Sequence, residues 1–266
     1  MSCFRARHPR PQGATSPDDV DSVVLAAAIA EAHRVGHARA PHVLRAPICR
    51  RPLQELRPLP WEELPVNAGL VRQVARRLVL YPPWPAPTLA TLAGLVEAAA
   101  AATVHPLTVN EATFMAYDWP DGGISPHRDG ARYRGAVIVF TVEGTAPFRI
   151  HHSRDIEDVV ESWLTTPGDM LVLRAAAAGG VEGRAMHSVG PPLRGARVSL
   201  SFRDDSTRER STGSPASAAR APSPPDPIAT STTHLIDLSR RQLERPAHHP
   251  PLPLIERESG SVALTY

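Results

Sequence analysis

Apolar residues recur at helical spacing in three stretches of the first hundred residues. The pattern predicts helices over residues 20–37, 66–80 and 87–102. Acidic residues precede the first stretch, and Arg34 and His37 lie near its end, which suits the helix dipole. Between the first two stretches, prolines at positions 47, 52, 58, 60 and 65 disfavour long helices and favour extended or turning chain. We therefore expect residues 21–103 to form a helical, proline-rich part.

After residue 104 the pattern changes to short runs that alternate between apolar and polar residues, separated by Gly, Pro and Asp turns. The predicted strands cover residues 112–117, 124–129, 136–142, 148–151, 162–166, 170–173, 184–189 and 197–202. Most of them have no helix-length segment between them, which favours a jelly roll over a parallel α/β sheet. The predicted fold is α+β: a double-stranded β-helix (jelly roll) core at residues 104–204, with the N-terminal helices packed on it as a cover.

The two ends of the chain lack such patterning. Residues 1–20 mix Arg, Pro, Gly and Asp, and residues 205–266 form a low-complexity tail rich in Ser, Pro, Arg and Ala, so both are predicted to be disordered. The apolar run from Val23 follows acidic residues, unlike a signal peptide, and residues 89–104 are too short and alanine-rich for a membrane span. Cys3 and Cys49 are too few for a disulfide framework. We expect a cytoplasmic protein with no membrane partner.

Charge changes this picture little. All 29 positive charges are arginines, and the formal net charge is +2. The absence of lysine has two explanations, an arginine-rich surface for phosphates or a coding bias of the genome. We favour the bias, because a net charge of this size does not by itself indicate a nucleic-acid-binding surface.

Candidate chemistry concentrates in residues 122–129. His127 and Asp129 are two positions apart in a predicted strand, so alternation aims both side chains at one face. An imidazole and a carboxylate are two thirds of the iron site built from two histidines and one carboxylate. Such a pair arises readily by chance, so it counts only with support from elsewhere. His187 is the candidate third ligand, although a single histidine is more often a surface or satisfied core residue.

The strand at residues 197–203 has one apolar and one polar face. Its polar face carries Arg197, Ser199, Ser201 and Arg203, and its apolar face carries Val198, Leu200 and Phe202. The apolar face belongs in a core. The polar face suits a dicarboxylate, because guanidinium groups bind carboxylates through paired hydrogen bonds. An edge strand with a solvated polar face is the alternative.

In their order along the chain, these elements resemble the iron(II)- and 2-oxoglutarate-dependent dioxygenases, and within them the AlkB-like branch. The resemblance covers about residues 81–204. It rests on Pro83-Trp-Pro85 before a helix, Tyr117, a Gly and an Ile before His127-Arg-Asp129, Pro167-Gly-Asp169, His187, and the closing strand Arg197-x-Ser-Leu-x-Phe-Arg203.

The resemblance implies that His127, Asp129 and His187 hold Fe(II) and form the catalytic centre. It also implies that Arg197, with Tyr117 and Ser199, binds the far carboxylate of the cosubstrate 2-oxoglutarate, while Arg203 lies near the other end. The implied reaction uses O2 to convert 2-oxoglutarate to succinate and CO2 while it oxidises a C–H bond of the substrate. In the AlkB-like branch the substrate is an alkylated nucleic acid, whose bases are oxidatively dealkylated. We expect the enzyme to be a monomer.

Three departures from the family pattern concern the cosubstrate and the substrate. Met115 replaces an asparagine that commonly contacts the cosubstrate, Ala131 replaces an acidic residue of the bacterial repair enzymes, and Arg174 stands where an aromatic residue is expected. Stacking of a flipped base requires flat apolar partners. The candidates are Trp61, Trp84, Trp119 and Trp163, for each of which core packing is the more common role.

The substrate class therefore stays open. The alternatives to nucleobase dealkylation are hydroxylation of a small molecule or an amino-acid side chain, and a non-catalytic metal-binding or interaction protein. In the nucleic-acid case a set of N-terminal arginines would face the phosphate backbone; otherwise they are solvated helix faces. The set is Arg45, Arg50, Arg51, Arg72, Arg76 and Arg77.

Overall fold

The computed structural model of the protein describes residues 20–176 and 183–208. These residues belong to one compact unit. The disorder predicted for the two ends of the chain falls almost entirely outside the described residues, although the last core strand runs to Asp205. None of the helices described here has the length and apolarity needed to cross a membrane.

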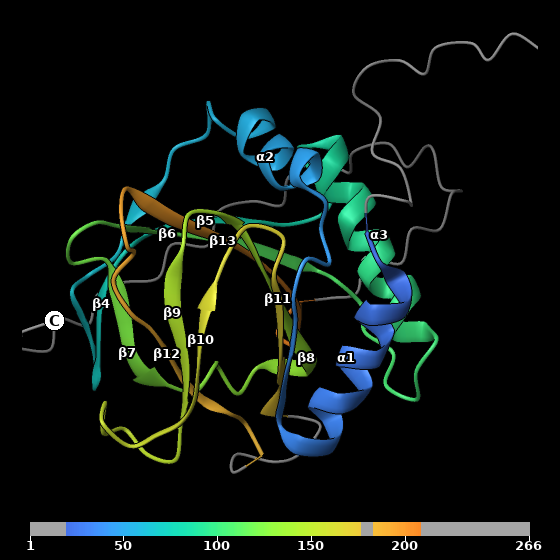
Figure 1. Ribbon diagram of the computed structural model, residues 1–266. Helices are drawn as coiled ribbons and strands as arrows, with labels where there is room; N and C mark the ends of the chain where they lie inside the picture. The colour runs from blue at the N-terminus through green and yellow to red at the C-terminus, as the bar shows by residue number, and fades with distance from the viewer. Residues whose placement is uncertain (1–19, 177–182, 209–266) are drawn as a thin grey trace, which may run out of the picture. The chain divides into compact units, whose positions relative to one another are not determined.

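Two antiparallel sheets form the core (Figure 1). The seven-stranded sheet has the order β1 (His37–Ala40), β11 (Met170–Arg174), β8 (Tyr133–Glu143), β13 (Ala196–Asp205), β6 (Glu111–Asp118), β5 (Arg76–Leu80) and β2 (Glu62–Glu63). The six-stranded sheet has the order β10 (Val159–Thr165), β9 (Ala146–His151), β12 (Met186–Val189), β7 (Gly123–His127), β4 (Val71–Val74) and β3 (Asn67–Ala68). Neighbouring strands within each sheet are mostly distant in sequence, as in a jelly roll.

Helices cover one side of this sandwich (Figure 1). They are α1 (Ser22–Val35), α2 (Ala46–Glu55) and α3 (Pro87–Ala101). Their apolar residues share one buried cluster with the seven-stranded sheet, in which Leu25 and Leu92 join Phe114 and Phe140. Local signals set the ends of α1: Asp21 accepts a 3.0 Å hydrogen bond from the amide of Val24, and Gly36 ends the helix at φ 104°.

Alternation predicted the core strands well. All eight expected strands are present, as β6 to β13, with shifts of a few residues at their ends. The helices expected over residues 20–37 and 87–102 are also present, as α1 and α3. These elements combine strong local signals with burial in the same core, so local preference and packing agree.

The helix predicted over residues 66–80 is wrong, because this stretch forms β3, β4 and β5. Gly69, at φ 60°, turns the chain between β3 and β4. β4 pairs with β7 and β5 pairs with β6, and the alternating Leu78 and Leu80 of β5 are buried. The apolar spacing fits a helix as well as a strand, and pairing with two core strands decides between them.

The N-terminal part also differs from a purely helical cover. Its strands β1 to β5 extend both sheets, so it completes the sandwich as well as covering it. The ten-residue helix α2 forms where extended or turning chain was expected. Pro47 is compatible with this helix because the amides of the first turn have no acceptor within the helix, so a missing amide proton there costs no hydrogen bond. Pro52 lies inside the helix.

Candidate metal centre

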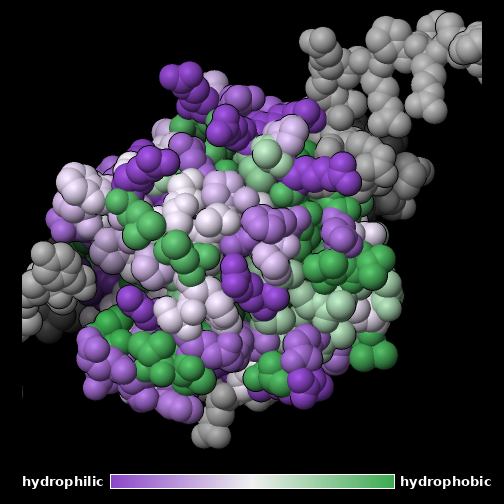
Figure 2. Space-filling model, in the orientation of Figure 1, coloured by the Kyte–Doolittle hydropathy of each residue, from purple (hydrophilic) through white to green (hydrophobic). Residues whose placement is uncertain are grey.

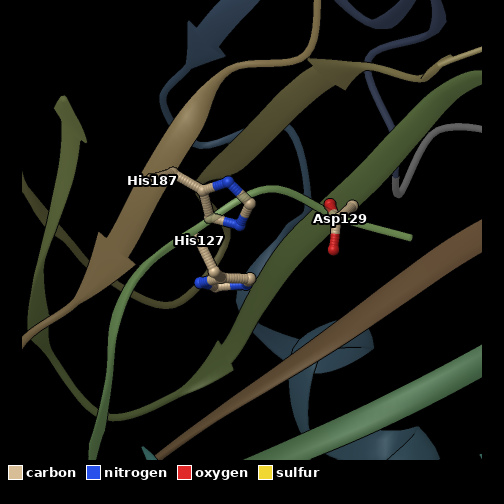
Figure 3. Close-up of side chains that lie close together, drawn as sticks. All are labelled: His127, Asp129 and His187. Carbon is tan, nitrogen blue, oxygen red and sulfur yellow. The ribbon is translucent and has the colours of Figure 1, made fainter. Parts of the chain in front are cut away.

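The structure brings His127, Asp129 and His187 together between the two sheets (Figure 3). His127 ends β7 and pairs in register with His187 on the neighbouring strand β12. The two imidazole centroids are 4.3 Å apart. One potential ligand atom from each of the three residues lies within 4.8 Å of the others. This spacing matches three donors converging on one metal ion.

Asp129 reaches this cluster from a different kind of segment than expected. The strand predicted to run to residue 129 ends at His127, so strand alternation does not place the carboxylate. Instead, Arg184 donates a hydrogen bond to the backbone carbonyl of Asp129, and Arg128 Nε donates to the carbonyl of Arg184 over 3.0 Å. These bonds tie the segment after β7 to the start of β12.

Backbone carbonyls orient both imidazoles. The Nδ1 atom of His127 lies 3.0 Å from the carbonyl of Ser125, and that of His187 lies 3.1 Å from the carbonyl of Ala185. A carbonyl only accepts hydrogen bonds, so each Nδ1 carries the proton and each Nε2 presents its lone pair to the cluster. Such orientation of a ligating histidine by its second nitrogen is usual in metal sites.

The electrostatics keep the cluster in the protonation state that binds metals. Burial, with help from the neighbouring His187, lowers the pKa of His127 to about 4. Burial alone would raise the pKa of the Asp129 carboxyl, but His187, Arg203, His127 and Arg184 together outweigh it and lower that pKa. At neutral pH the site therefore offers a neutral imidazole at 127 and a carboxylate at 129.

A cavity of about 230 Å³ extends from these three residues to the inner face of the seven-stranded sheet. Arg197 lines it and is 1% exposed. Its Nη2 donates to Thr141 Oγ1 over 3.0 Å, and its Nε has no hydrogen-bond partner in the described structure. Burial lowers the pKa of Arg197, and Tyr117, whose ring centroid lies 5.7 Å from the guanidinium carbon, offsets part of this effect.

Tyr117 and Ser199 line the same cavity beside Arg197. Tyr117 is opposite Arg197 in the β6–β13 register, and Ser199 is two residues further along β13. Burial raises the pKa of Tyr117, so its hydroxyl keeps its proton at neutral pH. The three side chains therefore present only neutral or positively charged hydrogen-bonding groups, an arrangement suited to an anion.

Arg203 lies on the same face of β13 but has a different environment. Its Nη1 donates to Glu111 Oε1 over 2.9 Å, and its guanidinium carbon lies 4.9 Å from the centroid of the Tyr133 ring. Burial alone would lower the pKa of Arg203, but Asp129, Tyr133 and Glu111 raise it. Arg203 thus has its own carboxylate partner and lies beside the cluster of His127, Asp129 and His187.

Sequence reasoning missed Glu111. It is 1% exposed and also accepts hydrogen bonds from the hydroxyls of Tyr133 and Thr113, each over 3.1 Å. Glu111 is directly opposite Arg203 in the β6–β13 register. The sequence shows that Glu111 shares a strand face with Thr113 and Tyr117, which could have indicated a position near the site. Only the register of β6 with β13 shows which arginine it contacts.

The residues that depart from the family pattern lie in different parts of the structure. Met115 lines the cavity, whereas Arg174 donates to the carbonyls of Gly183 and His33 over 2.8 and 3.0 Å and does not line it. None of the four tryptophans lines the cavity. Trp61 and Trp84 pack against the larger core cluster, Trp163 packs against the smaller one, and Trp119 is 60% exposed.

No protein-family model and no curated protein matches this sequence. Solved structures do match the fold. A prolyl hydroxylase from Trichoplax adhaerens, solved in complex with a hypoxia inducible factor oxygen degradation domain peptide fragment, has a TM-score of 0.52 at 10% identity over 70% of this chain and 91% of that one. A Pseudomonas putida prolyl-4-hydroxylase has a TM-score of 0.50 at 20% identity over 68% of this chain and 99% of that one.

The non-heme alpha ketoglutarate dependent epimerase SnoN, from nogalamycin biosynthesis, has a TM-score of 0.50 at 16% identity. The match covers 69% of this chain and 81% of that one. At such identities the likeness establishes the fold alone. The two antiparallel sheets of this chain are the jelly-roll sandwich that these oxygenases share.

Proposed function

We propose that this chain is an iron(II)- and 2-oxoglutarate-dependent dioxygenase. His127, Asp129 and His187 would hold the metal, and the donor set fits Fe(II) because it combines two imidazoles with one carboxylate. When bound, iron with O2 and 2-oxoglutarate supplies the oxidising chemistry for a C–H bond and yields succinate and CO2.

The observation that carries this proposal is the buried Arg197. Among the described residues, this guanidinium, which is 1% exposed, has no carboxylate partner and no hydrogen-bond partner at Nε, so its burial is unfavourable unless an anion binds beside it. It shares its cavity with the metal-binding cluster. A dicarboxylate that reaches the metal with one end and Arg197 with the other satisfies both features.

The surrounding residues have defined tasks in this proposal. Arg197 binds the far carboxylate, Ser199 and the protonated Tyr117 add hydrogen bonds to it, and Val137 and Val139 form apolar cavity walls that limit water. Arg203, held by Glu111, lies toward the metal-binding end and favours the ionised form of Asp129. Met115 offers no hydrogen bond at the position of the family's asparagine, so Arg197 carries more of the cosubstrate affinity.

For the substrate we propose an alkylated nucleobase, oxidised as in the AlkB-like branch. The support is the ordered set of family elements described above. Hydroxylation of a small molecule or an amino-acid side chain is the second candidate. The observation that favours it is that the flat rings of the cavity already have partners. Phe148 stacks on His187 with ring centroids 5.4 Å apart, and the Tyr133 and Tyr117 rings lie 4.9 and 5.7 Å from the guanidinium carbons of Arg203 and Arg197.

Succinate formation separates these candidates. The protein is incubated with Fe(II), O2 and 2-oxoglutarate, and with methylated single-stranded oligonucleotides, amino-acid and metabolite pools, or no substrate. Stimulation by the oligonucleotides, lost in His127→Ala, supports dealkylation, and stimulation by the pools alone selects the second candidate. No succinate from the metal-loaded protein under any condition would contradict the enzyme proposal and favour a non-catalytic metal-binding protein.

A further inference from the structure

A second groove lies on the six-stranded sheet, on the face opposite the metal-binding cluster. It has a volume of about 580 Å³. Four polar side chains cross it in a row over four neighbouring strands: Arg72 on β4, Ser125 on β7, Ser188 on β12 and Arg149 on β9. Arg149 and Ser188 are opposite in register, and the amide of Arg72 donates to Ser125 Oγ over 2.9 Å.

Strand alternation separates this row from the catalytic cavity. Gln73 and His187, the sequence neighbours of Arg72 and Ser188, line the cavity on the inner face. Ile124 and Val189 contribute to the lining of both spaces. The groove is therefore a distinct site that shares one wall with the cavity.

The two end arginines of the row lack partners. Within the described part of the chain, neither the Arg72 nor the Arg149 guanidinium makes a hydrogen bond or an ion pair. By contrast, Arg76 donates to Asp118 over 3.1 Å and Arg77 to Glu62 over 2.7 Å. The arginine set predicted to face a nucleic acid is thus divided: Arg76 and Arg77 have carboxylate partners, whereas Arg72 lines this groove with an unpaired charge.

The rest of the lining leaves an excess of positive charge. Arg154 joins the groove and holds its place with a 3.5 Å hydrogen bond to the carbonyl of Pro126. Asp121 and Asp155 also line it, and the Asp155 carboxylate accepts a 3.0 Å hydrogen bond from the amide of Glu157. Three arginines against two aspartates give a formal charge of +1.

The Ser125 hydroxyl and the spacing of the arginines suit phosphate groups, whereas the Ser188 hydroxyl is buried and lies 2.8 Å from His151 Nε2. Ser125 Oγ accepts from the Arg72 amide, so its own proton is available to donate to an anion. Three strand spacings separate Arg72 from Arg149, about 14 Å. One phosphate between two outward-pointing arginines at that separation would contact only one of them well, whereas a ligand with several phosphate groups can contact both arginines and Ser125 between them.

We propose that this groove binds phosphate groups, carried either by a single-stranded polynucleotide or by a small polyphosphate. The polynucleotide source rests on the proposed nucleobase substrate, whose strand would continue outside the cavity. The phosphate chemistry itself does not depend on that proposal, because it follows from the unpaired arginines and the Ser125 hydroxyl of the outer face.

The test uses the full chain without metal. Fluorescence anisotropy measures binding of an unmodified, labelled oligothymidylate of about ten nucleotides, a usual site size, across a salt series. Calorimetry measures binding of inorganic triphosphate. The variant is Arg72→Gln with Arg149→Gln. The matched control is Arg57→Gln with Arg194→Gln, which removes the same charge at two exposed positions outside the groove.

We expect the groove variant to lose affinity for at least one probe, while the control binds like the wild type. With the oligonucleotide, the slope of log K against log salt should flatten by about 1.4, which is about 0.7 for each phosphate contact removed from a single strand. Loss of oligonucleotide binding identifies a polynucleotide as the source. Loss of triphosphate binding alone identifies a small polyphosphate.

The proposal is overturned if neither probe binds the wild type, if the groove variant binds both as tightly as the wild type, or if the control variant loses as much affinity. Thermal unfolding and metal binding of both variants verify that the fold and the His127 cluster are intact. Because no metal, cosubstrate or alkylated base is present, failure here leaves the succinate test untouched, and the reverse also holds.

Discussion

The two ends of strand β13 carry buried arginines in opposite electrostatic settings. Among the described residues, neither arginine has a hydrogen-bond partner at Nε, but Arg203 is matched by the Glu111 carboxylate at 2.9 Å and lies near Asp129, whereas Arg197 has only the neutral Thr141 as a hydrogen-bond partner. A matched buried charge is part of the folded framework, and an unmatched one is a cost that a ligand can relieve. We infer that one end of the strand builds the site and the other receives the cosubstrate.

The largest expected effect is on metal affinity at the matched end. Asp129→Ala removes the one carboxylate of the cluster, and we expect Fe(II) affinity to fall by more than about a hundredfold, beyond the usual effect of residues that only orient ligands. Anaerobic calorimetry measures it. Asp121→Ala, at an exposed aspartate, is the control and should bind as the wild type does. Equal affinities in the two variants would remove Asp129 from the ligand set.

Glu111→Gln breaks the match at Arg203 directly. It leaves the Arg203 guanidinium, whose side chain is 13% exposed, without its carboxylate, so we expect the free energy of unfolding to drop by about 3 kcal/mol. Denaturant titration measures the change. The same substitution at the exposed Glu143 should cost less than about 0.5 kcal/mol. A loss no larger than in that control would show that Arg203 does not depend on Glu111.

The metal-binding end should also make stability depend on pH. The pKa of His127 is about 4 in the folded chain against 6.5 for an ordinary histidine. Between pH 4 and pH 6.5, this residue therefore binds a proton in the unfolded chain but stays neutral in the folded chain. Stability of the metal-free protein should therefore fall, by about 2 kcal/mol, as the pH drops from 6.5 to 4. In His127→Gln this part of the slope should disappear; an unchanged slope would assign it to other groups.

The smallest effect has the opposite sign and belongs to the unmatched end. Arg197→Gln removes an uncompensated buried charge, so the protein without cosubstrate should gain about 1 kcal/mol in its free energy of unfolding. Thermal or denaturant unfolding measures this. A loss of unfolding free energy as large as that of Glu111→Gln would show that Arg197 stabilises the fold as Arg203 does, so the two ends of β13 would not differ.

The sequence predicted most of the jelly roll because its core strands alternate clearly and its flanking helices carry local signals. It could not predict β3 to β5, since the apolar positions of residues 66–80 fit two periods and their partners β6 and β7 come later in the chain. The structure brings His127, Asp129 and His187 together, and their role as ligands stays a prediction.

Register explains what else was missed at the site. Glu111 meets Arg203 through the pairing of β6 with β13, and Arg72 joins Arg149 only because β4 and β9 flank the same two strands. Such contacts depend on strand order, which a pattern of polar and apolar residues does not encode. Alternation shows which residues share a face but not which of them become neighbours.

The most direct test is an anaerobic titration of the Fe(II)-loaded protein with 2-oxoglutarate, comparing the wild type, Arg197→Gln and the control Arg194→Gln at a nearby exposed arginine. Loss of a buried charge-assisted contact is worth about 3 kcal/mol, so Arg197→Gln should bind 2-oxoglutarate about a hundredfold more weakly with unchanged Fe(II) affinity. Equal affinity for 2-oxoglutarate in all three proteins would contradict the assignment of Arg197 and the function built on it.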